Sequence, residues 1–517
     1  MISYKKIIFL FLFIQIISIL YSAPTKIKIL FTCDTNGRPL SFTEMQQEGQ
    51  GGIPARATLI KKLIGTDKKK GNVLILDTGS VFIGRPESDL YNGETDIAGM
   101  NAIGYDAVAI GITEIMRPKS DFDKLNNLAE FYYISSNLFS KSQTGDKEEL
   151  IGDDYFIKKF GNVTVGIFSL ITEDALLQLP SQYREDYIIK DPITIAKEMV
   201  EILKTKKKVD IIIALTHLGY YPDDSKIGSR TLANSVKGID IIIDGVTGLN
   251  FTEPIIIGNT KIFQVMKWGL YLGEIDITFE NKKITDIQYK AHPVNYKENG
   301  VLVGEALEDD PKVLAEITKK MKNYEKLAKK KLTTIEKGKN LSTQGIRERE
   351  TELGNLICDA ILDYTKADIA FQNAGGIEQG QIDPNNITRE TFDKIIRYDN
   401  SIVTLNLTGS EIKEILSYSM SRIGYGAFLQ VSGISFVYSR SSKSFKTIKI
   451  KNKELDEDTI YKVAINSWLA NGGDGYKIFI DKKKVDHKKI IREVVYDYIA
   501  SQKILKPSLN NRIVIED

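Results

Sequence analysis

The sequence is poor in cysteine and has almost no excess of charge of either sign. Among its 517 residues there are only two cysteines, Cys33 and Cys358, far apart in the chain. This excludes a framework of disulfides of the kind that holds small secreted domains together. The 70 basic and 68 acidic residues leave a net charge of +2, without the basic excess that binding to a phosphate backbone needs. We therefore expect no nucleic-acid partner.

The first 22 residues have the layout of an export signal. Lys5 and Lys6 precede a mostly apolar run from Ile7 to Leu20, and small residues follow it. This pattern predicts a secretory signal peptide over residues 1–22. An uncleaved anchor helix is the alternative, although a bilayer span usually needs about 20 apolar residues. On either reading the protein is exported, to the periplasm or the cell surface, and no other membrane contact is expected.

The first half of the chain alternates short apolar runs with amphipathic ones. Polar or glycine-rich residues end most of the runs, which is typical of buried strands in an α/β sheet. The runs are KIKILFT (26–32), NVLILD (72–77), VTVGIFSL (163–170), VDIIIALTH (209–217) and IDIIIDG (239–245). In α/β sheets, ligands sit in the loops beyond the carboxyl ends of the strands. The loops after these runs are therefore the candidate site.

A chain of this length predicts two or three domains. Asp310 and Pro311 signal the start of a helix. Its apolar stripe comprises Val313, Ile317, Met321, Tyr324 and Ala328. Because its other faces are rich in lysine, we expect a solvated bridging helix over residues 310–335, between a first domain over 24–309 and a second over 336–517.

The second domain is expected to hold further helices. Apolar residues recur there at helical spacing: Leu353, Leu356, Ile357, Ala360, Ile361 and Tyr364. Thr408 with Glu411 forms a capping-box signal, which predicts the start of another helix.

Short motifs follow the apolar runs. In order they are CDTNGR (33–38), DTGSVF (77–82), AIGITEI (109–115), ALTHLGY (214–220) and DGVTG (244–248). The second half contains RERETELGNLICDA (347–360), FQNAGGI (371–377), GAFLQVSGISFVY (426–438) and SWLANGGDGY (467–476). In order and spacing these motifs resemble the 5'-nucleotidases of the metallophosphoesterase superfamily, over about residues 25–517.

This resemblance implies an α/β protein. It comprises a four-layer metallophosphoesterase-like α/β sandwich domain, the bridging helix, and a C-terminal α/β domain of the 5'-nucleotidase type. In the family, the C-terminal domain grips the nucleoside and rotates to deliver its phosphate to two metal ions.

Most of the family's metal-ligand positions carry other residue types here. Only Asp34 and His217 keep the family residue. The other five positions are Asn36, Ser80, Ile112, Val246 and Gly248. Thr113 replaces the histidine that assists catalysis in the family. A metal pair needs several carboxylate, imidazole and amide ligands, including a bridging carboxylate, so we expect at most a residual site at Asp34 and His217. A divalent metal cofactor is expected only if the protein is an enzyme with an atypical site.

Three other carboxylates, Asp77, Glu114 and Asp244, lie on or beside the same loops. Their oxygens suit a hard cation such as Mg²⁺ or Ca²⁺. Carboxylates at strand ends also serve to cap helices or to accept backbone hydrogen bonds, and the sequence leaves both roles open. His217 is open in the same way, either as a ligand or as a structural histidine.

The second half keeps the family's nucleoside contacts. Tyr398 and Trp468 stand where the family stacks the base, and such stacking contributes roughly 1–3 kcal/mol per base. Asp474 stands where the ribose hydroxyls are held. The other carried-over binding positions are Asn373, Gly375 and Gly376, beside base and sugar, and Arg347, toward ribose or phosphate. Ordinary core packing of the two aromatic residues is the alternative.

One change in this domain reverses a charge. Glu378 stands where the family has a phosphate-binding arginine. A charge pair at about 4 Å is worth roughly 4 kcal/mol at an intermediate dielectric, so we expect phosphorylated ligands to lose the most affinity.

The sequence therefore predicts an exported protein that binds a nucleoside or nucleotide and has largely lost the dinuclear hydrolytic centre. Two alternatives stay open. One is an active 5'-nucleotidase or related phosphoesterase of nucleotide catabolism, using an atypical metal site on Asp34 and His217. The other is a surface interaction protein in which the pocket is a relic.

Overall fold

The computed structural model describes residues 24–44, 47–65, 72–83, 85–141, 148–179, 181–223, 226–323, 326, 329–378, 380, 382–396, 398 and 400–517. The predicted signal peptide, residues 1–22, lies outside these ranges. Within them, no helix combines the length and the apolar character that a membrane span requires.

Two six-stranded sheets form the first half of the protein. The first has the order β17 (Lys283–Pro293), β16 (Tyr271–Glu280), β1 (Thr25–Thr32), β4 (Val73–Asp77), β5 (Ala107–Ala109) and β6 (Tyr132–Ile134). The second has the order β14 (Ile255–Ile257), β15 (Thr260–Phe263), β13 (Ile241–Asp244), β12 (Ile211–His217), β10 (Val163–Ile171) and β9 (Tyr155–Phe160). The five apolar runs of the sequence are thus confirmed as strands β1, β4, β10, β12 and β13.

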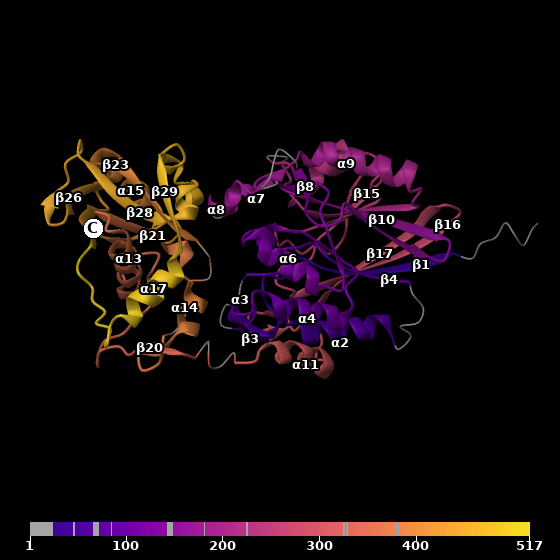
Figure 1. Ribbon diagram of the computed structural model, residues 1–517, viewed down its shortest axis with the longest axis horizontal. Helices are drawn as coiled ribbons and strands as arrows, with labels where there is room; N and C mark the ends of the chain where they lie inside the picture. Colours follow the sequence, from indigo (N-terminus) through magenta and orange to yellow (C-terminus); the bar gives the residue numbers. More distant parts are fainter. Residues whose placement is uncertain are drawn as a thin grey trace, which may run out of the picture.

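The two sheets pack face to face because their strands are apolar on both sides. On β1, Ile29 lies in a core shared with Ile213 of β12, whereas the adjacent Leu30 packs on the other side with helices α2 (Ile53–Ile64) and α4 (Glu94–Ile103). Ile212 of β12 likewise packs against α9 (Pro192–Glu201) and α10 (Ser229–Ser235). Figure 1 shows α9 above the strands and α2 and α4 below them. The four-layer α/β sandwich is confirmed.

The predicted bridging helix is shorter and better packed than expected. Helix α11 spans Pro311–Lys320, and the Asp310 side chain caps it by accepting from the main-chain N–H groups of Lys312 and Val313. The expectation of a helix over 310–335 is wrong in length, because α11 ends at Lys320 with Met321 as its C-cap and β20 occupies Lys331–Thr333. Tyr324 and Ala328 of the predicted stripe lie outside the described residues.

Helix α11 also lies against the first half of the chain. Its Val313 and Ile317 are buried in the same core as α2 and α4. Gly99 of α4 permits this close approach, since a Cβ atom there would lie 2.9 Å from Ile317 Cδ1. The helix therefore belongs to an outer layer of the sandwich and is not a free-standing spacer.

The second half is built on a five-stranded sheet, shown in orange and yellow in Figure 1. Its order is β24 (Leu429–Ser432), β21 (Ile369–Asn373), β28 (Ile460–Asn466), β23 (Ser401–Thr408) and β29 (Lys484–Ile490). A four-stranded sheet follows, with the order β27 (Lys453–Glu454), β26 (Ser444–Ile450), β25 (Ile434–Ser439) and β30 (Ile513–Glu516). One hydrophobic core joins the five-stranded sheet to α13 (Glu352–Thr365), α15 (Gly409–Met420) and α17 (Ile491–Ala500).

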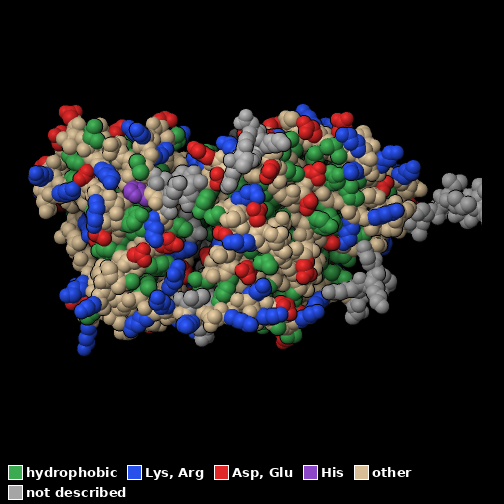
Figure 2. Space-filling view, viewed as in Figure 1, with side chains coloured by type: hydrophobic (Ala, Val, Ile, Leu, Met, Phe, Trp, Pro, Cys, Tyr) green, Lys and Arg blue, Asp and Glu red, His purple; other side chains and the backbone are tan. Residues whose placement is uncertain are grey.

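Both helix signals of this half are confirmed. The Thr408 hydroxyl accepts from Glu411 N, and a Glu411 carboxylate oxygen accepts from Thr408 N. In α13 the predicted apolar residues are buried except Tyr364, which is 43% exposed. On the visible surface, basic and acidic side chains are interspersed (Figure 2), as the small net charge suggests.

Candidate functional site

The strand-end loops of the first half converge because the strands that precede them are parallel neighbours. β1 pairs in parallel with β4, and β4 with β5; β12 pairs in parallel with β13. Several loop residues adopt positive φ, including Asp34 (46°), Ser80 (55°) and Val246 (72°). Residues other than glycine rarely take this backbone conformation. Such strain concentrates at sites where the surrounding contacts fix the backbone.

His217, at the end of β12, is buried and uses both ring nitrogens within the protein. Its Nδ1 lies 3.0 Å from the carbonyl oxygen of Thr78, and its Nε2 lies 3.0 Å from the Ser80 hydroxyl. A carbonyl oxygen only accepts, so Nδ1 carries the proton and Nε2 accepts from the hydroxyl. Burial lowers the pKa of His217, which keeps the ring neutral.

Ser80 connects this histidine to a third loop. Its hydroxyl oxygen accepts from the main-chain N–H of Ile112 at 3.1 Å. The same hydroxyl therefore donates to His217 and accepts from the loop after β5. The lone pair of Nε2, which a metal ion would use, is directed at this hydroxyl.

Asp34 lies beside the histidine and is also held by the chain. One carboxylate oxygen accepts from Val246 N at 2.8 Å, and the other lies 3.6 Å from His217 Nδ1. Burial raises the pKa of Asp34 to about 7. The backbone of Gly245 packs closely on both side chains, because a Cβ atom there would lie 2.9 Å from the Asp34 carboxylate and 3.2 Å from His217 Nδ1.

The other three carboxylates accept hydrogen bonds from neighbouring loops. Glu114 accepts from the main-chain N–H groups of Ser80, Val81 and Gly111 at 2.7–2.9 Å. Asp77 accepts from the Thr32 hydroxyl and from Gly79 N. Both carboxylates thus accept the hydrogen bonds that the structural role requires, whereas the cation role stays untested.

Asp244 likewise accepts hydrogen bonds from the end of a neighbouring strand and the loop after it. It accepts from the Thr216 hydroxyl at 2.8 Å and from the main-chain N–H groups of Leu218 and Gly219. Burial raises the pKa of Glu114 and Asp244, and that of Asp77 to about 8. Across the described ranges of the chain, no group of three or more His, Cys, Asp or Glu side chains is arranged to hold a metal ion.

The remaining carried-over metal positions offer little coordination. Ile112 and Val246 have hydrocarbon side chains, and Gly248 lies under Lys267, whose Cδ is 3.0 Å from where a Cβ atom would stand. Asn36 is half-buried. The Thr113 hydroxyl, at the position of the family's catalytic histidine, accepts from Phe82 N at 3.2 Å.

In the second half, the structure brings Asn373 and Asp474 together. Asn373 ends β21, and its Nδ2 donates to Asp474 Oδ2 at 2.6 Å. Trp468 lies in the short helix α16 (Ser467–Ala470), and Asp474 follows that helix after Asn471 and two glycines. An added Cβ atom on Gly473 would overlap the Trp468 ring, so the loop carrying Asp474 packs directly against this aromatic side chain.

The two aromatic residues are accessible, which disfavours simple core packing. Tyr398 is 45% exposed and Trp468 is 37% exposed. The ring contacts seen in the described part of the chain include none between them, so stacking of a base by both stays a prediction.

The other predicted binding residues surround the same strand end. Gly375 and Gly376 form the turn after β21, and Gly375 N donates to Gly426 O at 2.8 Å. The Arg347 side chain is exposed, and its carbonyl oxygen accepts from Gly424 N at 2.7 Å. The main chain of Glu378 is fixed by donation to Ile395 O at 2.9 Å.

Two residues of this region escaped the sequence reasoning. Asn466 Nδ2 donates to Asn373 Oδ1 at 2.7 Å, and the Tyr418 hydroxyl donates to the carbonyl oxygen of Asp474 at 2.9 Å. Asn466 directly precedes the SWLANGGDGY motif and caps its short helix, which was the available signal. Nothing in the local sequence marks Tyr418.

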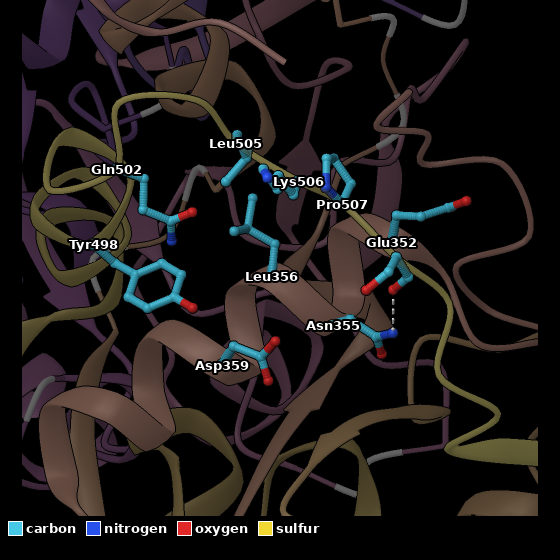
Figure 3. A pocket seen from close by; sticks show the side chains of 10 residues that line it. Glu352, Asn355, Leu356, Asp359, Tyr498, Gln502, Leu505, Lys506 and Pro507 are labelled. Carbon is cyan, nitrogen blue, oxygen red and sulfur yellow. Dashed lines mark hydrogen bonds between the residues drawn. The ribbon is translucent and has the colours of Figure 1, made fainter. Parts of the chain in front are cut away.

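A separate pocket of about 60 Å³ lies between α13 and the chain after α17 (Figure 3). None of its ten lining residues is a predicted nucleoside contact. Its Asp359 pairs with Arg512, and its Asn355 donates to the carbonyl oxygen of Ser508. These bonds fasten the C-terminal segment to α13, which is a structural role.

Comparisons with known proteins agree with the motifs. The family described as 5'-nucleotidase, C-terminal domain, matches residues 330–501. The 5'-nucleotidase of Vibrio cholerae serotype O1 is 30% identical over 514 residues, covering 92% of this chain and 90% of that protein. Protein UshA of Yersinia enterocolitica is 29% identical, covering 93% and 92%.

Solved structures extend the likeness to the whole architecture. The 5'-nucleotidase precursor from Thermus thermophilus has a TM-score of 0.66 at 26% identity and covers 95% of this chain and 99% of that one. The NAD nucleotidase of Haemophilus influenzae, at 19% identity, shares the fold with a TM-score of 0.60 and covers 96% and 100%. Because its motifs, its fold and its relatives agree, we conclude that the chain belongs to the 5'-nucleotidase family.

Proposed function

We propose that this protein is an exported nucleoside-binding member of the 5'-nucleotidase family whose dinuclear hydrolytic centre is largely lost. The observation that carries the proposal is the pairing of His217 Nε2 with the Ser80 hydroxyl at 3.0 Å. Export rests on the signal pattern of residues 1–22. The ligand class is taken from the relatives, which are named 5'-nucleotidases.

The residues present do not fit a pair of metal ions. A bridging metal site needs an anionic ligand between the two cations, and Ser80, which by resemblance stands where the family has its bridging aspartate, offers only a neutral hydroxyl there. Asp34 and His217 remain as donors of the family set, with Asp34 Oδ1 3.6 Å from His217 Nδ1. Ile112, Val246 and Gly248 contribute no side-chain donor atoms.

The nucleoside contacts support binding in the second half. Asp474 is fixed by Asn373, and the partly exposed ring of Trp468 packs on the neighbouring Gly473. A ribose hydroxyl and a stacked base are the partners that such a pair of groups suits. Glu378 carries a negative charge where the family has an arginine, so we infer that the unphosphorylated nucleoside binds better than its 5'-monophosphate.

An active nucleotidase is the second candidate, favoured by the names of the relatives and by the surviving contact between Asp34 and His217. Titration calorimetry with Mn²⁺ or Zn²⁺, beside a phosphate-release assay on adenosine monophosphate, separates the two candidates. We expect no stoichiometric pair of metal sites, and turnover at background that Asp34→Ala does not change. Two tight sites, or turnover that Asp34→Ala abolishes, would establish the enzyme instead.

Binding is tested by the fluorescence of Trp468. A Trp268→Phe variant removes the only other tryptophan, so adenosine should change the signal of Trp468 directly. Trp468→Ala should weaken adenosine binding, measured by calorimetry, by about 1–3 kcal/mol. If adenosine binds to neither protein, the relic-pocket alternative gains.

A further inference from the structure

Asp474 is held in a backbone conformation that it would not choose alone. Its φ and ψ are 54° and 18°, in the left-handed region that residues other than glycine rarely adopt. Such a conformation persists where neighbouring groups over-determine it. The groups that do so here are therefore part of how the carboxylate is presented.

Tyr418 of α15 is one of these groups. Its hydroxyl donates to the carbonyl oxygen of Asp474 at 2.9 Å, and an added Cβ atom on Gly475 would overlap the same hydroxyl. The Tyr418 ring is itself fixed by an edge contact with Tyr476, with ring centroids 4.8 Å apart. Because Trp468 packs on Gly473 from the other end, the Gly-Asp-Gly turn is clamped between two aromatic side chains.

Asn466 fixes the side chain of Asp474 through a relay. The Asn466 Oδ1 atom accepts from Leu469 N as the cap of α16, which leaves Nδ2 to donate to Asn373 Oδ1. Asn373 must then present its own Nδ2 to Asp474 Oδ2. Gln372 supports the same arrangement, since its Nε2 also donates to Asn373 Oδ1 at 3.2 Å and its Oε1 accepts from Asn466 Nδ2 at 3.1 Å. The helix cap and Gln372 thus together orient the Asn373 amide toward the Asp474 carboxylate.

The relay leaves one carboxylate oxygen for a ligand. Within the described residues, Asp474 Oδ1 has no hydrogen-bond partner, whereas Oδ2 is bound by Asn373. A carboxylate oxygen only accepts, so it suits a ligand that presents a hydroxyl donor. Adjacent to a stacked base, the donors that a nucleoside offers are the hydroxyls of its sugar.

We propose that Tyr418 and Asn466 are positioning residues that preset Asp474 for the ribose hydroxyls, so that the protein selects ribonucleosides over nucleosides lacking them. The inference rests on the proposed function, since it assumes that a nucleoside binds beside Trp468. Neither positioning residue touches the ligand; each acts through Asp474. Both are expected to affect sugar recognition and to leave base stacking unchanged.

The experiment compares adenosine with 2′,3′-dideoxyadenosine by calorimetry on the full chain and three variants. Tyr418→Phe removes one hydroxyl, and Asn466→Ser removes the amide donor while keeping a good helix cap. The matched control is Tyr461→Phe, which removes a tyrosine hydroxyl that accepts from Asp456 N at 3.3 Å. Tyr461 lies near the start of β28 and Asn466 at its end, so the control is remote from the site.

We expect the unaltered protein to bind adenosine at least about tenfold more tightly than the dideoxynucleoside, because a hydrogen bond to a charged group is lost. Tyr418→Phe and Asn466→Ser should each weaken adenosine about threefold to tenfold, with the dideoxynucleoside changed less than twofold. Tyr461→Phe should change neither.

The inference is overturned if the two positioning variants weaken both ligands equally, or neither, since a purely structural role would then suffice. Equal binding of the two ligands by the unaltered protein also overturns it, while leaving the proposed function intact. Failure to bind either ligand removes the proposed function and this inference together.

Discussion

Replacing Ser80 by alanine tests whether the hydroxyl holds the loops around His217 together. The substitution leaves His217 Nε2 without its donor and Ile112 N without its acceptor, and both residues are buried. An unsatisfied buried group costs about 1–3 kcal/mol. Two such groups predict a loss of about 2–6 kcal/mol in the free energy of unfolding.

Urea unfolding, followed by tryptophan fluorescence, measures this loss in the first half of the protein, which contains Ser80. In a Trp468→Phe background, Trp268 is the only tryptophan and lies next to the site, because its main-chain N–H donates to the carbonyl oxygen of Asp34 at 2.8 Å. The transition of the first half should move to lower urea with an unchanged slope, which indicates a change in stability alone.

Ser169→Ala provides the matched control. Ser169 is fully buried in β10, but its hydroxyl has no hydrogen-bond partner among the residues that the structure describes. Its removal should cost less than about 1 kcal/mol. If Ser80→Ala is no more destabilising than Ser169→Ala, the hydroxyl does not bridge His217 and Ile112, and the argument against a metal at Nε2 loses its basis.

Three other outcomes are expected. Burial raises the pKa of Asp96 from 3.8 to about 7, so the folded state keeps a proton that the unfolded chain has released, and stability falls as the pH rises between about 4 and 7. Asp96→Asn should flatten the pH dependence of the urea midpoint over that range, and an unchanged slope would contradict this. Thr408→Ala should cost about 1 kcal/mol by removing the cap of α15, measured by urea unfolding of the second half against a Thr459→Ala surface control; equal costs would count against it. Glu378→Arg should tighten adenosine monophosphate and leave adenosine nearly unchanged in calorimetry, and unchanged affinity for the monophosphate would argue that position 378 is distant from the phosphate.

Most of the fold could be predicted because its signals are local. The runs around Ile29, Ile167 and Ile213 are rich in apolar residues, many of them β-branched, which is typical of buried strands. The helix after Asp310 was misjudged in length. Its apolar stripe continues in the sequence beyond Lys320, but the helix itself ends at Lys320. The left-handed backbone at Asn323 that follows has no strict residue signature.

The sequence predicted which residues lie at the candidate sites, but not which of their side chains bond to each other. The motifs placed Asp34, Ser80 and His217 on converging loops, but Ser80 and His217 are 137 positions apart. Whether two such side chains bond to each other or to a shared ion depends on distances of a few tenths of an ångström, which spacing along a chain does not fix. The relay through Asn466 was missed for a related reason, since an asparagine before a short helix is already explained by capping.

The chemistry of position 80 explains why its change has consequences beyond one lost ligand. An ionised carboxylate has only acceptor atoms, so beside His217 Nε2 it requires either a cation between the two groups or a second proton on the imidazole ring. A serine hydroxyl donates to Nε2 and still accepts from Ile112 N, which satisfies both groups without any ion. The same hydroxyl is neutral and cannot balance the charge of two divalent ions. A serine at position 80 therefore lets this buried loop cluster satisfy the hydrogen bonds of His217 and Ile112 without a metal ion, as the proposed loss of the dinuclear centre requires.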